Sequence, residues 1–297
     1  MSNSLSLNNV RYLSSSEAVG DNVTHFFKTR SLLRKKTSRD FESYRKNIPT
    51  TWNGLNVGYD IWWDNREQRD SFGLPKVNGF VYSDLMSTCL YFRPTNSLLS
   101  KIHLNNIIEN ESFIDEKLIN SIMNDLDDKY TLTTSSDKSY PDSVIFLPGT
   151  NLLAFESFID YDKLNLAVQN GAYVKPHPLT TKYHLEMIKH RYGDRVIDVK
   201  ESGYEYLRHC KNVYCCTNSE LGLVGLLYDK NVVVLDLIGG ADLQRFGGYS
   251  EIYNAVRNNK ENLMKLFSCE YSGLIKINKD TARIKSFFSS FNIFCRK

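Results

Sequence analysis

Residues 173–179 of the chain read "YVKPHPL". The first residues of this stretch are typical of a buried strand, which ends where two prolines bracket His177. Each proline fixes its own φ and pushes the residue before it toward an extended backbone. Lys175 and His177 are therefore held extended, and His177 lies on a stiff corner. Taken alone, the stretch is equally compatible with an ordinary strand-to-helix turn that carries an exposed histidine, so the flanking sequence has to decide.

The sequence on both sides alternates short apolar runs with stretches of helical spacing. We predict strands at 143–149, 172–178, 195–199, 212–217 and 231–237. We predict helices at 155–169, 180–192, 203–210 and 219–229. Short apolar strands that alternate with helices form βαβ units, so this half of the chain predicts a parallel sheet covered on both faces.

The remaining sequence is less regular. We expect strands within 55–64 and 77–92, both with acidic residues near their ends, and an amphipathic helix within 111–128. The polar run 131–143 is typical of a linker. Residues 280–294 predict an amphipathic helix, with Asp280 as its N-cap.

Composition indicates an ordinary globular protein. The chain has 297 residues, of which 41% are hydrophobic and 24% charged, with a net charge of +3. No apolar run approaches the roughly 18–20 residues of a membrane span. The N-terminus lacks the features of a secretory signal, so we expect a cytoplasmic protein. The six cysteines show no CxxC motif or metal-ligand spacing, which favours buried free thiols.

Two polar motifs follow predicted strands. Residues 175–178 (Lys-Pro-His-Pro) close one strand, and residues 217–220 (Thr-Asn-Ser-Glu) close another and open a helix. Thr217 with Glu220 fits a capping box. A helix start is also a ready anion site, and ligands of parallel sheets bind at the carboxyl ends of the strands. We therefore expect His177 and the helix start to converge on one phosphate.

These motifs resemble those of the bacterial sialyltransferases, polysialyltransferases and capsular Kdo-transferases. The members of this group carry a His-Pro pair and a Ser/Thr-Ser pair, both in the nucleotide-sugar domain. His177-Pro178 matches the first pair, and Thr217-Asn218-Ser219 matches the second with an inserted asparagine. The resemblance covers residues 144–237, about a third of the chain.

The resemblance implies an α/β, GT-B-like fold, in which two Rossmann-like domains with parallel sheets enclose a cleft. Applied to this chain, it implies an acceptor-binding domain at 1–135 and a nucleotide-sugar-binding domain at 136–279, followed by a C-terminal helix at 280–297. It also implies an inverting transferase that needs no metal or other cofactor, and the sequence contains no DxD motif.

The group's chemistry assigns roles to the matched residues. Glycosyl transfer builds negative charge on the departing phosphate, which His177 would stabilise by a hydrogen bond. Lys175 and Pro178 belong to the same corner, and Lys175 would add a positive charge or face solvent. The site that holds the donor phosphate or a sugar carboxylate would be completed by Thr217, Asn218, Ser219 and the amides behind them.

An inverting transferase also needs a base that removes the proton of the acceptor. The group's acidic Asp/Glu-Asp/Glu-Gly motif is absent here, so we consider Asp84, Asp60 and Asp64 as candidates. Asp84 is expected at the carboxyl end of a strand, facing the cleft. Asp60 and Asp64 flank Trp62-Trp63, a pair able to stack on a sugar or a base.

The sequence leaves open both the acceptor and the type of activity. The resemblance implies a UDP- or CMP-sugar as the donor. Chain size, a Lys/Asn/Tyr/Phe-rich composition and the basic segment 25–47 favour hydroxymethylated cytosine in phage double-stranded DNA as the acceptor. The alternatives are a transferase that builds a surface polysaccharide, a sugar-nucleotide epimerase, and a nucleotide-binding protein without turnover.

Overall fold

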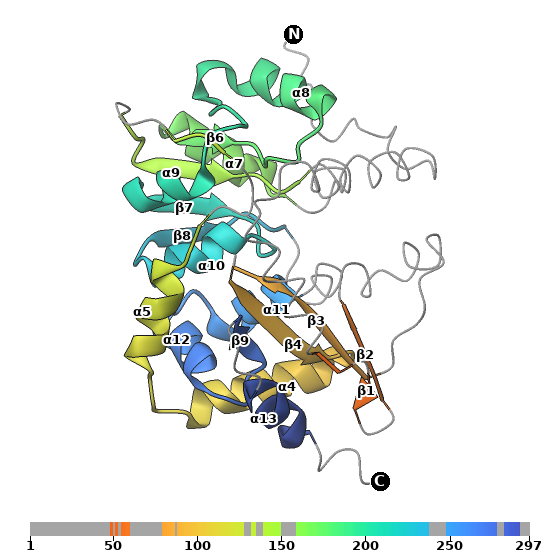
Figure 1. The fold of residues 1–297 in the computed structure, drawn as a ribbon. Coiled ribbons are helices and arrows are strands. Elements are labelled where there is room, and N and C mark those ends of the chain that lie inside the picture. The colour runs from red at the N-terminus through yellow and green to blue at the C-terminus, as the bar shows by residue number, and fades with distance from the viewer. Residues whose placement is uncertain are drawn as a thin grey trace. The chain divides into compact units, whose positions relative to one another are not determined.

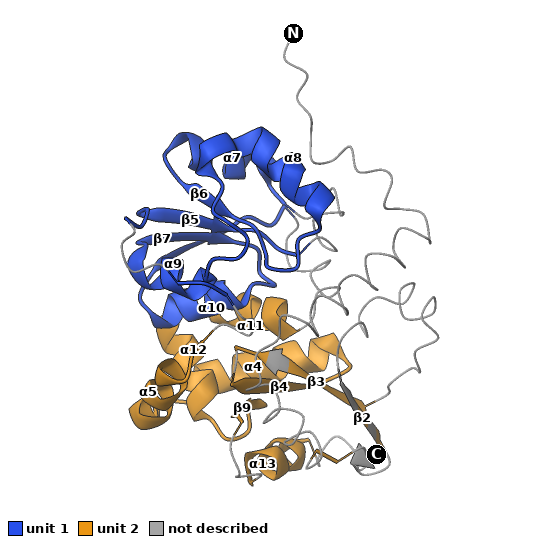
Figure 2. Cartoon of the chain, turned by 45° about the horizontal axis from the view of Figure 1, so that its top comes forward, with its two compact units in different colours: residues 1–35, 128–239 blue, residues 36–127, 240–297 orange. Residues whose placement is uncertain are grey.

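The computed structural model describes residues 48–49, 51–52, 55–59, 79–86, 88–127, 132–134, 139–149, 159–237, 248–277 and 282–291. The chain divides into two compact units (Figure 2): unit 1 comprises residues 1–35 and 128–239, and unit 2 comprises residues 36–127 and 240–297. Among the described helices, none combines the length and the apolar character that crossing a lipid bilayer requires.

Unit 1 is built on a parallel sheet of four strands, as the sequence predicted. The strands are β5 (Ser143–Phe146), β6 (Tyr173–Lys175), β7 (Asn212–Cys215) and β8 (Asn231–Val234). The helices are α7 (Tyr161–Gln169), α8 (Lys182–Tyr192), α9 (Gly203–His209) and α10 (Glu220–Leu227), with a 3-10 turn, η3 (Gly193–Arg195). Helices thus separate successive strands along the chain, which is the βαβ pattern (Figure 1).

The strand order of this sheet is β6-β5-β7-β8, and every neighbouring pair is parallel. The chain therefore leaves β5 on one side to reach β6 and then crosses to the other side to form β7. The order reverses between β5 and β7, and such a switch point opens a crevice at the carboxyl ends of the strands.

One predicted strand of this half is wrong. Residues 195–199 form a single parallel bridge, between Val196 and Val174, and no strand. A turn cuts the pairing short, because Asp198 accepts the backbone N–H of Glu201 at its carbonyl, at 3.1 Å, and that of Lys200 at its carboxylate, at 2.9 Å.

Unit 2 contains a five-stranded sheet in the order β1-β2-β3-β4-β9. Its strands are β1 (Thr51–Trp52), β2 (Leu55–Tyr59), β3 (Gly79–Leu85), β4 (Cys89–Pro94) and β9 (Leu274–Lys276). Its helices are α4 (Ser97–Asn110), α5 (Glu116–Asn124), α11 (Gly248–Val256), α12 (Lys260–Ser268) and α13 (Ala282–Ser290). Two of them, α5 and α13, lie within predicted helices, whereas the proposed cap Asp280 lies outside the described residues.

The expectation of a second parallel sheet is wrong for unit 2. Only β2 and β3 pair in parallel, and the other neighbours are antiparallel. The reason is the turn between β3 and β4, where Cys89 donates its N–H to the carbonyl of Met86 at 2.8 Å. So short a connection reverses the chain, whereas a parallel return needs a crossover of a dozen residues or more.

The compact units also differ from the expected domain ranges 1–135, 136–279 and 280–297. Residues 240–279 belong to unit 2, where β9 pairs with β4 through the register Leu90 to Ile275. The C-terminal helix α13 belongs to the same unit.

The core of unit 2 follows from the alternation of side chains along its strands. Phe80 of β3 and Phe92 of β4 lie on one face of the sheet, against Phe287 and Phe288 of α13. The Phe80 and Phe288 rings meet edge to face, with their centroids 5.0 Å apart. Burial of these large rings holds α13 on the sheet.

Buried polar groups occupy the opposite face of β4. Tyr91 and Arg93 alternate with the apolar residues of the strand, and Arg93 is 2% exposed. The carboxylate of Glu251, on α11, receives the Arg93 guanidinium at 3.3 Å, the Tyr91 hydroxyl at 3.1 Å and the Ser100 hydroxyl at 2.7 Å. Burial, and then the charge of Glu251, raise the pKa of Tyr91. One carboxylate thus joins β4, α4 and α11.

We expect Glu251→Gln to lower the free energy of unfolding by about 3–5 kcal/mol, because it removes the counter-charge of a buried guanidinium. Glu261→Gln, which removes a 62% exposed carboxylate that pairs with Lys265 on α12, is the matched control and should cost less than about 1 kcal/mol. Urea denaturation measures both. Equal denaturation midpoints for the two variants would show that the buried pair stabilises the fold no more than the control pair does.

Candidate functional site

The candidate site lies at the carboxyl edge of the unit 1 sheet. Because all four strands are parallel, the segments that follow β5, β6, β7 and β8 must begin at this one edge. The predicted donor-binding residues follow β6 and β7, and both groups are therefore brought to the same edge.

His177 lies on a tight turn directly after β6. Its carbonyl accepts the N–H of Thr180 at 2.9 Å, which closes a four-residue turn with Pro178 in the second position, where a proline is favoured. The half-buried ring accepts the N–H of Leu179 at Nδ1, at 3.1 Å. A neutral ring with this bond carries its proton on Nε2, so the turn fixes which nitrogen is the donor.

Lys175 is 3% exposed and does not face solvent. Its ammonium donates to the carbonyls of Pro176 at 3.0 Å and Val199 at 3.2 Å. It thereby ties the end of β6 to the following segment, and it places a buried positive charge at the carboxyl edge.

The predicted capping box of Thr217 and Glu220 is wrong. The N-cap of α10 is Ser219, and the hydroxyl of Thr217 donates to the carboxylate of Asp236 instead. The N–H of Thr217 also points at this carboxylate, 3.1 Å from one oxygen and 3.2 Å from the other. The Glu220 carboxylate accepts the Tyr204 hydroxyl at 2.6 Å.

Asp236 is the site residue that the sequence analysis missed. It follows β8, and its carboxylate holds Thr217, the second residue after β7. Burial raises its pKa, against the hydrogen bonds from Thr217 and Cys216, which lower it. Burial also raises the pKa of the Cys216 thiol, and the charge of Asp236 adds to this shift. The only signal in the sequence was that Asp236 is the one acidic residue of the predicted strand 231–237.

The start of α10 has the features of an anion site. Ser219 makes no side-chain cap bond, so no cap from this residue occupies the first amides of the helix. A turn precedes the helix, in which Ser219 donates its N–H to the carbonyl of Cys216 at 2.9 Å. Beside these amides, Oδ1 of Asn218 is buried and has no hydrogen-bond partner among the described residues, so it is suited to a donor group of a ligand and not to an anion. Free amides at a helix start favour an anionic group.

The His177 corner and the α10 start are separated by β5, which lies between β6 and β7. Two strand spacings amount to about 10 Å, so contact with one phosphate depends on the reach of the side chains. A ligand with a diphosphate, or with a phosphate and a sugar, spans such a distance more readily. Convergence of the two groups on one phosphate stays a prediction.

The structure describes only part of one candidate base and none of the other two. Asp84 is the last but one residue of β3 in unit 2, in register with Leu90, and its side chain is outside the described part. Asp60, Asp64 and the intervening Trp62-Trp63 lie outside the described residues. The basic segment 25–47 lies outside them as well.

Two further buried polar groups in unit 1 belong to the last residue of the His177 turn and to a histidine four positions after it. Nε2 of His184 and Oγ1 of Thr180 have no hydrogen-bond partner within the described ranges. His184 is 2% exposed, and its Nδ1 pairs with the Thr181 hydroxyl at 2.8 Å. Burial lowers the pKa of His184, which keeps the ring neutral at neutral pH.

Comparisons with known proteins show a likeness in structure. No family model matches the chain, and no curated protein matches it in sequence. Among solved structures, the chain is similar to the KpsC beta-Kdo 2,4 transferase of Thermosulfurimonas dismutans, with 16% identity and a TM-score of 0.43. The alignment covers 79% of this chain and 85% of that one.

We expect Asp236→Ala to lower the free energy of unfolding by about 2–3 kcal/mol, because it leaves the N–H and hydroxyl of Thr217 without their acceptor. Asp142→Ala is the control, since it removes a carboxylate that is 70% exposed and pairs with Lys211, and it should cost less than about 1 kcal/mol. Denaturant unfolding measures both. A loss no larger for Asp236→Ala than for Asp142→Ala would contradict the bracing role.

The stability of unit 1 should fall in acid because of His184. Its pKa is lowered from the ordinary 6.5 in the folded state, so the unfolded chain binds the proton more tightly. Its contribution is complete above about pH 6.5 and declines below it, by at most about 1.4 kcal/mol per pH unit. His184→Gln should flatten the pH dependence measured by thermal unfolding between pH 7 and pH 5. His190→Gln, at an exposed position of the same helix, should leave it unchanged; identical slopes for both variants would refute the assignment.

Proposed function

We propose that the chain is an inverting glycosyltransferase of the type that builds surface polysaccharides, and that the carboxyl edge of the unit 1 sheet binds its nucleotide-sugar donor. The observation that carries the proposal is the order β6-β5-β7-β8, which puts the His177 turn and the open start of α10 at one edge beside a switch point. The ordered His-Pro and Thr-Asn-Ser motifs support the same reading.

The proposed chemistry at this edge is charge stabilisation. As the glycosidic bond to the donor phosphate breaks, negative charge develops on the departing phosphate. Nε2–H of His177, oriented by the bond that Nδ1 accepts, would donate to it. The amides at the start of α10 would bind a second anionic group, and buried Lys175 would favour both through its charge. No step requires a metal.

Each residue of the second motif has its own proposed part. Thr217 is committed to Asp236, so it would hold the loop and leave the ligand to Ser219 and the helix amides. The base that takes the acceptor proton stays a proposal among Asp84, Asp60 and Asp64.

We favour a glycan over DNA as the acceptor. The arguments for DNA came from chain size, composition and the basic segment 25–47, and that segment is outside the described residues. The motifs that resemble the capsular and sialyl enzymes, by contrast, lie on described strands and turns.

The test combines donor turnover with a variant of His177. The purified chain is incubated with a panel of CMP- and UDP-sugars, alone, with oligosaccharide acceptors, or with hydroxymethylcytosine DNA. We expect nucleotide release that oligosaccharide stimulates. His177→Ala should reduce turnover by at least about 100-fold, while nucleotide affinity changes by less than about tenfold.

The controls and other outcomes separate the alternatives. His190→Ala, at an exposed site on α8, should retain full turnover. Stimulation by DNA would move the acceptor to nucleic acid, and conversion of the donor sugar without an acceptor would indicate an epimerase. Turnover that survives in His177→Ala would make His177 structural and overturn the proposed site.

A further inference from the structure

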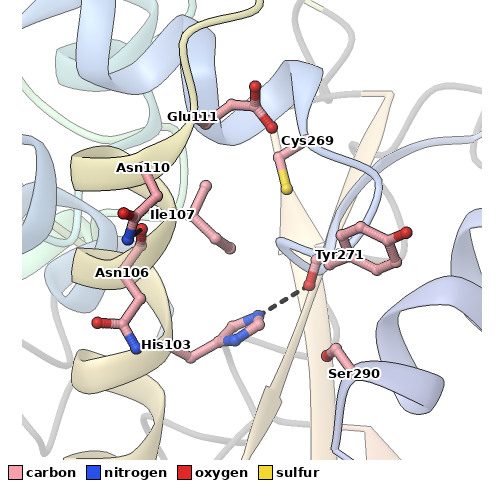
Figure 3. A pocket seen from close by; sticks show the side chains of 8 residues that line it. All are labelled: His103, Asn106, Ile107, Asn110, Glu111, Cys269, Tyr271 and Ser290. Atoms are coloured by element: carbon pink, nitrogen blue, oxygen red, sulfur yellow. Dashed lines mark hydrogen bonds between the residues drawn. The ribbon is translucent and has the colours of Figure 1, made fainter.

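Unit 2 contains a cavity of about 310 Å³ that the proposed function does not use (Figure 3). One wall is α4, which contributes His103, Asn106 and Asn110, and the opposite side contains Tyr271 and the end of α13. Its size is at the lower end of the range for small-molecule sites.

The wall on α4 offers several hydrogen-bonding groups. Asn106 and Asn110 are four residues apart and so lie on one face of the helix, and both are exposed. Nδ2 of Asn110 donates to the carbonyl of Asn106 at 2.8 Å, which leaves its Oδ1 as an acceptor. The Asn106 carboxamide has no hydrogen bond to any described residue, so it can serve as both donor and acceptor.

The neighbouring ring and carboxylate add acceptors. His103 is fixed by Nε2, which donates to the carbonyl of Tyr271 at 2.8 Å. Burial lowers the pKa of His103, so the ring is neutral at neutral pH and its Nδ1 is an acceptor. One oxygen of Glu111 accepts the N–H of Phe113 at 3.0 Å, and the second oxygen is left to interact with a ligand.

The charges of the lining exclude anionic ligands. Its described residues include no lysine or arginine, and Glu111 carries a negative charge. The Cys269 thiol is kept neutral because burial, and then the charge of Glu111, raise its pKa. Nowhere in the described ranges do three or more potential metal ligands (His, Cys, Asp or Glu) gather. The lining suits an uncharged ligand with several hydroxyl groups.

We propose that this cavity binds an uncharged saccharide unit. A sugar ring presents hydroxyls along its edge and C–H groups on its faces. The carboxamides, the His103 Nδ1 and the Glu111 carboxylate match the hydroxyls, while the side chain of Ile107, which points from α4 into the cavity, supplies apolar surface. The proposal concerns binding only and does not require transferase activity.

The test is ligand-observed saturation-transfer NMR with the full chain and a panel of methyl glycosides of neutral hexoses and N-acetylhexosamines. We expect transfer to at least one sugar. Asn106→Ala and Asn110→Ala, both at exposed positions of α4 that line the cavity, should weaken its binding by about three- to tenfold each.

Matched variants localise the binding. Glu109→Ala, at an exposed position of α4 outside the lining, should bind as the original chain does. His177→Ala should also leave this binding intact, which separates it from the donor site in unit 1. Absence of transfer for every sugar, equal binding by all variants, or displacement of the bound sugar by inorganic phosphate would overturn the proposal.

Discussion

Four parallel strands have to end at the same edge of their sheet, and the candidate site depends on this constraint. Each strand of unit 1 is short, and the polar groups of the candidate site come from the last residue of a strand or from the segment that follows it. Since the strand order reverses between β5 and β7, those segments diverge there, which is where a ligand meets backbone amides in place of packed helices.

The β8 end supplies the brace for this edge. Asp236 binds both the hydroxyl and the N–H of Thr217, across 19 positions of sequence. Within the Thr-Asn-Ser motif of residues 217–219, the Thr217 hydroxyl is turned toward Asp236, which follows the neighbouring strand, while Ser219 is the N-cap of α10. The motif is therefore divided between a residue that holds the loop and a residue beside the amides of α10.

The sequence predicted unit 1 well because its strands are continuous apolar runs bounded by glycine, proline or polar residues. It predicted unit 2 poorly, for physical reasons. The turn that makes β3 and β4 antiparallel was hidden in one apolar run, and α4 has no clear apolar stripe, since Leu98 is 64% exposed while Ser100 is buried. Asp236 could not be selected either, because its partner Thr217 becomes a neighbour only through the sheet.

The two units also differ in how their cores are assembled. The described residues of unit 1 lie between positions 132 and 237 of the chain. Unit 2 combines chain from before and after that segment: β9 extends the sheet beside β4, and Glu251 reaches Arg93 from 158 positions further on. The Glu251 carboxylate and the α13 rings can therefore pack against the sheet only when residues after 240 have folded onto the earlier part of unit 2. Bringing these two parts of the chain together costs loop-closure entropy, which the pairing of β9 with β4 and the burial of the α13 rings help to offset.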